Sequence, residues 1–304
     1  MRIVALAGGT GSAKLLRGLS GLGVDMTVVA NVGDNIWVHG LYVCPDLDIA
    51  MYTLAGLANR RQGWGIEGDT FRTLSQLGQI GEPTWFALGD MDIATHIVRT
   101  KMLREGLTLT SVMDKLRKAL GVDHAILPLT DDPVETRILT SAGDIHLQEF
   151  WVRDRGRPAV MGVAYKGSSK ARFTEEVEKA VKMADRIVLC PANPVTSIGP
   201  MLAVPGFSRR LSLARARVTA LSPMVGRVPF GGPAAKLMKA VGMRLNSVGV
   251  AKAYSEFLDS LVIDRSDESL AGEIEELGIK CILSSTLMAD PSDERRIAKE
   301  LLEA

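Results

Sequence analysis

The chain has 304 residues, of which 46% are hydrophobic and 23% charged, and its formal net charge is +1. This length is enough to bury a full core, either as one large α/β domain or as a core with an insertion. Interspersed charges of both signs exclude the electrostatic footprint of a nucleic-acid or membrane-surface binder, and no apolar run reaches the ~18 residues of a membrane span. We therefore expect a small-molecule partner.

The cysteines and the first apolar run indicate the cellular compartment. Cys44, Cys190 and Cys281 are odd in number and far apart in the sequence, which is typical of reduced thiols. The apolar run at the start is short and leads into glycines, so we expect a first strand rather than a signal peptide. These features predict a cytoplasmic protein.

A glycine-rich turn follows the first predicted strand, Ile3–Ala7, and precedes an amphipathic helix, Leu15–Leu22. Glycine allows the backbone to approach a ligand closely, and the N–H groups at the start of a helix attract anions. The turn therefore predicts a phosphate site rather than a plain βα turn. The residues expected to contact phosphate are Gly8, Gly9, Thr10, Gly11, Ser12 and Lys14.

The spacing within this turn argues against two common phosphate-binding motifs. A P-loop requires Gly-Lys-Ser/Thr, but Lys14 follows Ala13 and precedes Leu15. A dinucleotide fingerprint requires a third glycine where Lys14 stands, and the second predicted strand, Met26–Ala30, ends in Asn31 instead of an acidic residue. An NAD-dependent oxidoreductase is therefore only a minor alternative.

Short apolar runs bounded by turn residues alternate with helical patterns along the chain, which predicts an α/β fold with a doubly wound, mainly parallel Rossmann-like sheet. The predicted strands are Ile3–Ala7, Met26–Ala30, Ala125–Leu129, Arg186–Cys190, Val218–Leu221, Leu261–Ile263 and Cys281–Leu283. The later predicted helices are Phe173–Ala184, Pro233–Val241, Val250–Leu258, Ser269–Leu277 and Asp293–Leu302. Catalytic residues are expected at the carboxyl ends of the strands.

Residues 61–168 interrupt this alternation, and we interpret them as a mostly helical insertion that caps a core formed by residues 1–60 and 169–304. This segment contains a turn rich in tryptophan and glycine at Gly63–Ile66 and an alternating run at Ile145–Val152. Its predicted helices are Thr70–Leu77, Ile93–Glu105 and Ser111–Leu120.

Polar residues gather after the second strand, first at Asn31–Asn35 and then at Asp46 and Asp48, which precede a predicted helix at Ile49–Ala58. One interpretation of Asp46 is a helix N-cap and nothing more. Alternatively, two carboxylates near the phosphate turn hold Mg2+ through oxygen ligands, or one of them accepts a proton from a substrate hydroxyl.

Two further polar groups follow later in the chain. Asp90, Asp92 and His96 stand at the start of a predicted helix, where the spacing places Asp92 and His96 on one face. A structural Asp–His pair is favoured over zinc, because no second histidine or cysteine lies at ligand spacing. The loop after Cys190 contains Asn193 and Ser197 and suits ligand contact.

Several motifs, in this order, resemble those of the 2-phospho-L-lactate transferases, which act in the biosynthesis of the deazaflavin coenzyme F(420). They extend over most of the chain. The motifs are GGTGSAKLL (Gly8–Leu16), PDLD (Pro45–Asp48), GWGIEGDTF (Gly63–Phe71), LGDMDIATH (Leu88–His96), ILPLTDDPVET (Ile126–Thr136), NPVTSIGP (Asn193–Pro200) and GVAKAY (Gly249–Tyr254).

The resemblance implies transfer of a phospholactyl or phosphoenolpyruvyl group from a guanosine diphosphate conjugate to the ribityl hydroxyl of a deazariboflavin, with release of GMP, assistance by Mg2+ and a homodimeric enzyme. Asp46 and Asp48 would contact the metal and activate the hydroxyl. The residues that would contact the diphosphate or nucleotide are Gly9, Thr10, Gly11, Ser12, Lys14, Asn193 and Ser197. Those assigned to the deazaflavin are Trp64, Asp90, Asp92 and His96.

This sequence departs from the family pattern at four places, which points to a changed donor. Ser12-Ala13 stands where relatives often have Thr-Pro, and the turn Phe230–Pro233 also differs. Asn35 stands where an acidic residue is common, and Met91 where a basic residue is expected. The chief alternative is a nucleotide- or sugar-nucleotide-binding regulatory protein of the same superfamily that performs no transfer. Such a protein would lack the motifs around Trp64, His96 and Asn193, which are present here.

Overall fold

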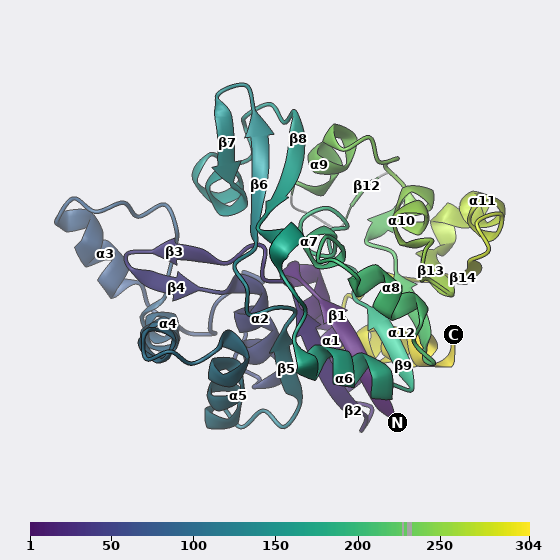
Figure 1. The fold of residues 1–304 in the computed structure, drawn as a ribbon, viewed down its shortest axis with the longest axis horizontal. Helices are drawn as coiled ribbons and strands as arrows, with labels where there is room; N and C mark the ends of the chain where they lie inside the picture. Colours follow the sequence, from purple (N-terminus) through teal and green to yellow (C-terminus); the bar gives the residue numbers. More distant parts are fainter. Residues whose placement is uncertain (227, 230–232) are drawn as a thin grey trace.

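The structure is a computed structural model that describes residues 1–226, 228–229 and 233–304. Its centre is a seven-stranded sheet of order β14-β13-β10-β9-β1-β2-β5, in which all neighbouring strands are parallel (Figure 1). The strands are β1 (Arg2–Ala7), β2 (Asp25–Ala30), β5 (Ala125–Pro128), β9 (Arg186–Leu189), β10 (Arg217–Leu221), β13 (Ser260–Asp264) and β14 (Lys280–Ser284). Each predicted apolar run forms one of them, so the predicted doubly wound fold is confirmed.

Helices cover both faces of this sheet, which explains why its strands are continuous apolar runs. On one face, α1 packs against α2 and α12, and on the other α6 packs against α8 (Figure 1). Their bounds are α1 (Gly9–Ser20), α2 (Pro45–Leu54), α6 (Glu175–Met183), α8 (Phe207–Ser212) and α12 (Pro291–Glu303). The remaining core helices are α7 (Gly199–Leu202), α9 (Ala234–Ala240), α10 (Ser247–Tyr254) and α11 (Ala271–Glu275), with 3-10 helices at Ser168–Lys170 and Arg265–Leu270.

The strand order reverses between β1 and β9. The chain runs from β1 to β2 and β5 in one direction and from β9 to β10, β13 and β14 in the other. The loops that follow β1 and β9 therefore diverge at neighbouring strand ends, and ligands of open α/β sheets bind at such a switch point. A short hairpin, β3 (Ile36–Val38) and β4 (Leu41–Val43), follows β2 and leads into α2.

Residues 61–168 form helices and a second sheet. The helices are α3 (Arg72–Gln79), α4 (Asp90–Arg104) and α5 (Leu109–Ala119), and the antiparallel sheet contains β7 (Gly143–His146), β6 (Glu135–Thr140) and β8 (Gly162–Lys166) (Figure 1). The division of the chain at residues 60 and 168 stays a prediction. Within residues 61–168, β5 belongs to the main sheet, where it pairs with β2.

The alternating run Ile145–Val152 is a strand only as far as His146, after which the chain forms a π-helix at Glu149–Arg153. The His146 ring and backbone turn the chain, because Nδ1 accepts from Gln148 N–H at 3.1 Å and the His146 N–H donates to the Glu149 carboxylate at 3.1 Å.

A two-stranded ribbon, β11 (Met224–Val225) and β12 (Val228–Pro229), follows β10. The adjoining Phe230–Gly232, where the sequence departs from the family pattern, lies outside the described residues. No helix within the described ranges is long and apolar enough to span a membrane.

Candidate active site

The glycine turn after β1 lies directly beneath the loop that follows β9. A Cβ atom on Gly8 would lie 2.5 Å from Ser197 Cβ, and one on Gly11 would lie 2.4 Å from the Pro191 carbonyl oxygen. Gly9 has a φ of +66°, in the left-handed region that favours glycine. These glycines are therefore required by the close packing of two loops at the switch point.

Asp46 binds the turn from the first turn of α2. Its Oδ1 accepts from Gly9 N–H at 2.6 Å and its Oδ2 accepts from the Asn31 amide at 2.8 Å. The residue is only 4% exposed, and burial raises the pKa of Asp46 to about 6 against the opposing effect of these two hydrogen bonds. The Asp46 carboxylate thus lies at the N-terminus of α1, where the sequence predicted a phosphate site.

Asn31 and Asp34 complete this buried polar cluster from the end of β2. The Asn31 amide also donates to the Thr196 carbonyl at 3.1 Å, and its Oδ1 accepts from Gly33 N–H, so it joins the loops after β2 and β9. Asp34 is 8% exposed, and its Oδ1 has no hydrogen-bond partner among the described residues. Burial, followed by the charge of Asp46, raises the pKa of Asp34 well above its ordinary value.

Sequence reasoning noted the polar stretch after β2 but did not select Asp34. The only signal was its position after the carboxyl end of a buried strand, and Asn31 and Asn35 share that signal.

Asp48 points away from Asp46, because residues two apart on an α-helix lie about 200° apart around its axis. Arg99, on α4, donates to both oxygens of Asp48, with Nη1 at 3.0 Å from Oδ2. The Arg99 side chain is 0% exposed. The two carboxylates that were predicted to act together therefore face different neighbours.

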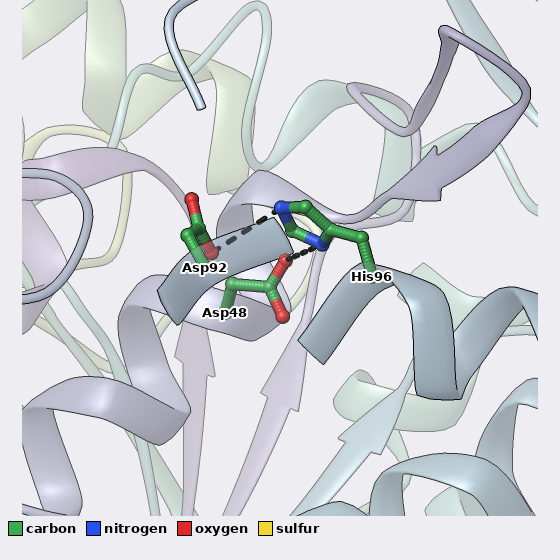
Figure 2. Close-up of side chains that lie close together, drawn as sticks. All are labelled: Asp48, Asp92 and His96. Carbon is green, nitrogen blue, oxygen red and sulfur yellow. Dashed lines mark ion pairs between the residues drawn. The ribbon is translucent and has the colours of Figure 1, made fainter. Parts of the chain in front are cut away.

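Asp92 and His96, also on α4, surround Asp48 (Figure 2). His96 Nδ1 lies 3.7 Å from Asp48 Oδ2 and Nε2 lies 3.2 Å from Asp92 Oδ1. Arg99 Nη1 lies 3.0 Å from His96 Nδ1 and can only donate, which assigns the ring proton to Nε2. The Tyr52 hydroxyl donates to Asp92 at 2.7 Å.

This cluster is better suited to joining α2 and α4 than to holding a metal. The carboxylates of Asp48 and Asp92 face different nitrogens of His96, and Arg99 already neutralises Asp48. Although burial acts in the opposite direction, the interactions with His96 lower the pKa of Asp92. The geometry supports the structural interpretation of the Asp92–His96 pair.

The remaining predicted phosphate contacts have diverse surroundings. The Ser12 hydroxyl bonds back to Gly8, donating to its carbonyl at 2.8 Å, whereas Thr10 is exposed at the start of α1. Lys14 Nζ donates to the Met288 carbonyl at 2.6 Å, toward the C-terminal segment. The structure thus holds Ser12 within the turn and turns Lys14 away from it.

The predicted residues after β9 shape the loop above the turn. Asn193 Oδ1 accepts from Val195 N–H at 2.9 Å and Thr196 N–H at 3.4 Å, and Ser197 is buried against Gly8. Asn193 therefore fixes the turn that brings Ser197 over the glycine turn after β1.

Two residues predicted to contact the deazaflavin lie around α3. Asp90 caps this helix by accepting from Thr73 N–H at 2.9 Å and from the Thr70 hydroxyl, and these bonds lower the pKa of Asp90. Trp64 is 39% exposed and packs edge-on against Phe71 beside a small cavity. A Cβ on the adjacent Gly63 would lie 3.5 Å from Thr10, so this loop borders the glycine turn.

Comparison with known proteins agrees with these features. The model of the family "2-phospho-L-lactate transferase CofD" matches residues 3–285. The chain belongs to this family. It is 41% identical to the 2-phospho-L-lactate transferase of Methanosarcina acetivorans, covering 98% of this chain and 97% of that protein. It is 42% identical to the phosphoenolpyruvate transferase of Streptomyces griseus, covering 100% and 98% respectively.

The family resemblance inferred from the motifs is thus confirmed. A solved structure of a UPF0052 family member from Bacillus halodurans superposes with a TM-score of 0.67, at 16% identity and 99% coverage of both chains. At this identity, the superposition establishes a shared fold. The chain is a family member with a Rossmann-like α/β fold.

Proposed function

We propose that the protein transfers a 2-phospholactyl or phosphoenolpyruvyl group from a guanosine diphosphate conjugate to 7,8-didemethyl-8-hydroxy-5-deazariboflavin, with release of GMP, in coenzyme F(420) biosynthesis. Family membership supports this activity, since relatives bear both transferase names. The observation that carries the chemistry is the buried polar cluster at the switch point, where Asp46 binds Gly9 N–H beneath the Ser197 loop and its charge acts on Asp34.

In the proposed reaction, the acceptor hydroxyl oxygen forms a bond to the phosphorus that carries the lactyl or enolpyruvyl group. The phosphoanhydride bond to the GMP phosphate breaks, and GMP leaves with the electron pair. The hydroxyl proton passes to the carboxylate of Asp46. Such a displacement depends mainly on alignment and on neutralisation of charge, so the positive end of the α1 helix dipole suits it.

We further propose Mg2+ as the cofactor. Asp34 and Asp46 would hold it, because both offer carboxylate oxygens and Asp34 Oδ1 has no partner within the described ranges. When bound, the ion would neutralise charge on the diphosphate. We do not assign metal contact or hydroxyl activation to Asp48, since Arg99 pairs with both of its oxygens.

The test is incubation of the purified protein with Mg2+, the deazariboflavin and each donor separately, following GMP release and the mass of the acceptor. We expect GMP release that depends on the acceptor, with one donor preferred. Asp46→Asn should lower turnover by about 100-fold or more. Asp123→Asn, a change at an exposed carboxylate remote from the pocket, should match the parent.

Two results would contradict the proposal. Near-parent turnover by folded Asp46→Asn would remove its assigned role. Binding of nucleotide without transfer from any donor would favour the regulatory protein instead.

We also propose a cytoplasmic homodimer that associates through α3 and α4. Helix α3 has no buried residue, and α4 presents apolar Met91, Ile97 and Val98 to solvent. Exposed apolar surface of this kind is typical of contact sites. Sedimentation of the parent and of Ile97→Glu should give a dimer and a monomer; a monomeric parent would contradict the proposal.

A further inference from the structure

An aromatic pair stands on the hairpin that joins the two halves of the pocket. The hairpin begins immediately after Asn35 and ends one residue before Cys44, which precedes α2. Trp37 lies opposite Tyr42 in the strand register, and their ring centroids are 4.9 Å apart at an interplanar angle of 45°. At 56% exposure, Trp37 is more exposed than the other tryptophans.

The opposite face of this hairpin is firmly anchored. Val38 and Val43 are buried against Leu88, and α4 contacts β4 through the Thr100 hydroxyl, which accepts from Tyr42 N–H at 2.8 Å. Because strand side chains alternate, burial of Val38 leaves Trp37 on the free face. The exposed indole therefore rests on a rigid support.

Hydrogen bonds connect this aromatic pair to the carboxylate pocket. The Asn35 amide donates to the Tyr42 hydroxyl at 3.3 Å, and Asn35 adjoins Asp34. Asn35 Oδ1 and Asp34 Oδ1 are both buried and lack partners among the described residues. Buried acceptors without donors are costly, and a ligand rich in hydroxyl groups would satisfy them.

The spacing fits a flat ring with a polyol chain. Trp37 is three residues after Asp34, so their Cα atoms are at most about 11 Å apart. A five-carbon chain with bonds of about 1.5 Å reaches on the order of 6 Å, which is about half of that separation. A ring over Trp37 therefore places its chain beside Asn35, in the direction of the carboxylates.

We propose that Trp37, supported by Tyr42, is the stacking platform for the tricyclic ring of the deazariboflavin acceptor. The polyol chain runs from there along Asn35 toward Asp34. This inference rests on the proposed function and places the ring at the β3–β4 hairpin rather than at Trp64. Stacking on an aromatic side chain increases the affinity for a flat ring without any contact to the reacting atoms. Trp37 therefore acts on acceptor binding and not on the transfer step.

The test is calorimetric titration of the full chain with the acceptor alone, followed by steady-state kinetics with the preferred donor. Trp37→Ala should raise the Kd for the acceptor about tenfold and raise the acceptor KM similarly. The donor KM and the kcat at saturating acceptor should stay within about twofold of the parent. Trp37→Phe should restore most of the affinity. Trp151→Ala, at an exposed tryptophan elsewhere (42%), is the matched control.

Several results would overturn the inference. It fails if Trp37→Ala binds the acceptor like the parent, or if Trp64→Ala weakens binding instead. A change of oligomeric state in Trp37→Ala with unchanged acceptor affinity would assign the indole to a second copy. If the parent converts the acceptor while Trp37→Ala has the parent's Kd, only this inference is lost. If the parent neither binds nor converts the acceptor, the proposed function fails with it.

Discussion

Removal of Arg99 should destabilise the protein strongly, because its guanidinium is the cation that pairs with Asp48 inside the buried cluster of Asp48, Asp92 and His96. We choose Arg99→Met, which keeps most of the length of the side chain. It leaves the Asp48 carboxylate buried without its guanidinium partner. It also removes the donors to the Tyr42 carbonyl and to His96 Nδ1.

The expected magnitude follows from the burial of the pair. The Arg99 and Asp48 side chains are 0% and 7% exposed. Removal of one partner of a buried ion pair costs about 3–5 kcal/mol, because an uncompensated charge remains inside. For a protein of this size or slightly smaller, each kcal/mol corresponds to about 2–4 °C in Tm, so Tm should fall by roughly 6–20 °C. The double variant Arg99→Met/Asp48→Leu should recover part of this loss.

Thermal and urea unfolding of the parent, of Arg99→Met and of the double variant would measure these differences. Arg153→Met is the control, because its pairs with Glu149 and Asp154 are largely exposed and worth about 1 kcal/mol or less. The reasoning is refuted if Arg99→Met is as stable as Arg153→Met, or if the double variant is less stable than Arg99→Met alone.

Two further predictions concern packing and pH. Gly11→Ala should lose about 1–3 kcal/mol of stability, because its methyl group would lie 2.4 Å from the Pro191 carbonyl oxygen. Gly21→Ala is the control, because the nearest atom to its methyl group would lie at 3.6 Å. Equal urea midpoints of the two variants would contradict this prediction. Burial lowers the pKa of His146 below 6.5, so folding favours the neutral ring, and this stability is present above pH 6.5 and is lost as pH falls below it. The unfolding free energy of His146→Gln minus that of the parent should therefore increase as the pH falls from 7.5 to 5.5, by up to about 1.4 kcal/mol per pH unit. A difference that does not depend on pH would disprove this prediction.

The sheet could be predicted from the sequence because its strands are buried on both faces. Such strands read as short apolar runs, as Ile3–Ala7 does, and each of the seven runs became a strand. The glycine-rich segment after the first strand could be identified because its residues are consecutive in the sequence, but the helix begins at Gly9 rather than at the predicted Leu15. The alternating run Ile145–Val152 did not by itself indicate where its strand ends, because alternation does not reveal the backbone turn made by His146 and Glu149.

The acidic pair shows how a small difference in helix boundary changes a site. The sequence placed Asp46 and Asp48 in a loop before a helix at Ile49, whereas α2 begins at Pro45. Both carboxylates therefore lie in its first turn, about 200° apart around the axis, and cannot converge. Asp46 meets Gly9 and Asp48 meets Arg99.

The sequence by itself determined the fold class and the family and identified the glycine-rich segment after the first strand, because these depend on residues close together in the chain. Only the tertiary structure decided which polar groups meet. Arg99 is 51 positions from Asp48, and Asn31 is 165 positions from Thr196. Contacts over such separations depend on how α4 and the loop after β9 pack against the sheet. No local pattern encodes that packing, so the partners of each carboxylate emerge only in the folded protein.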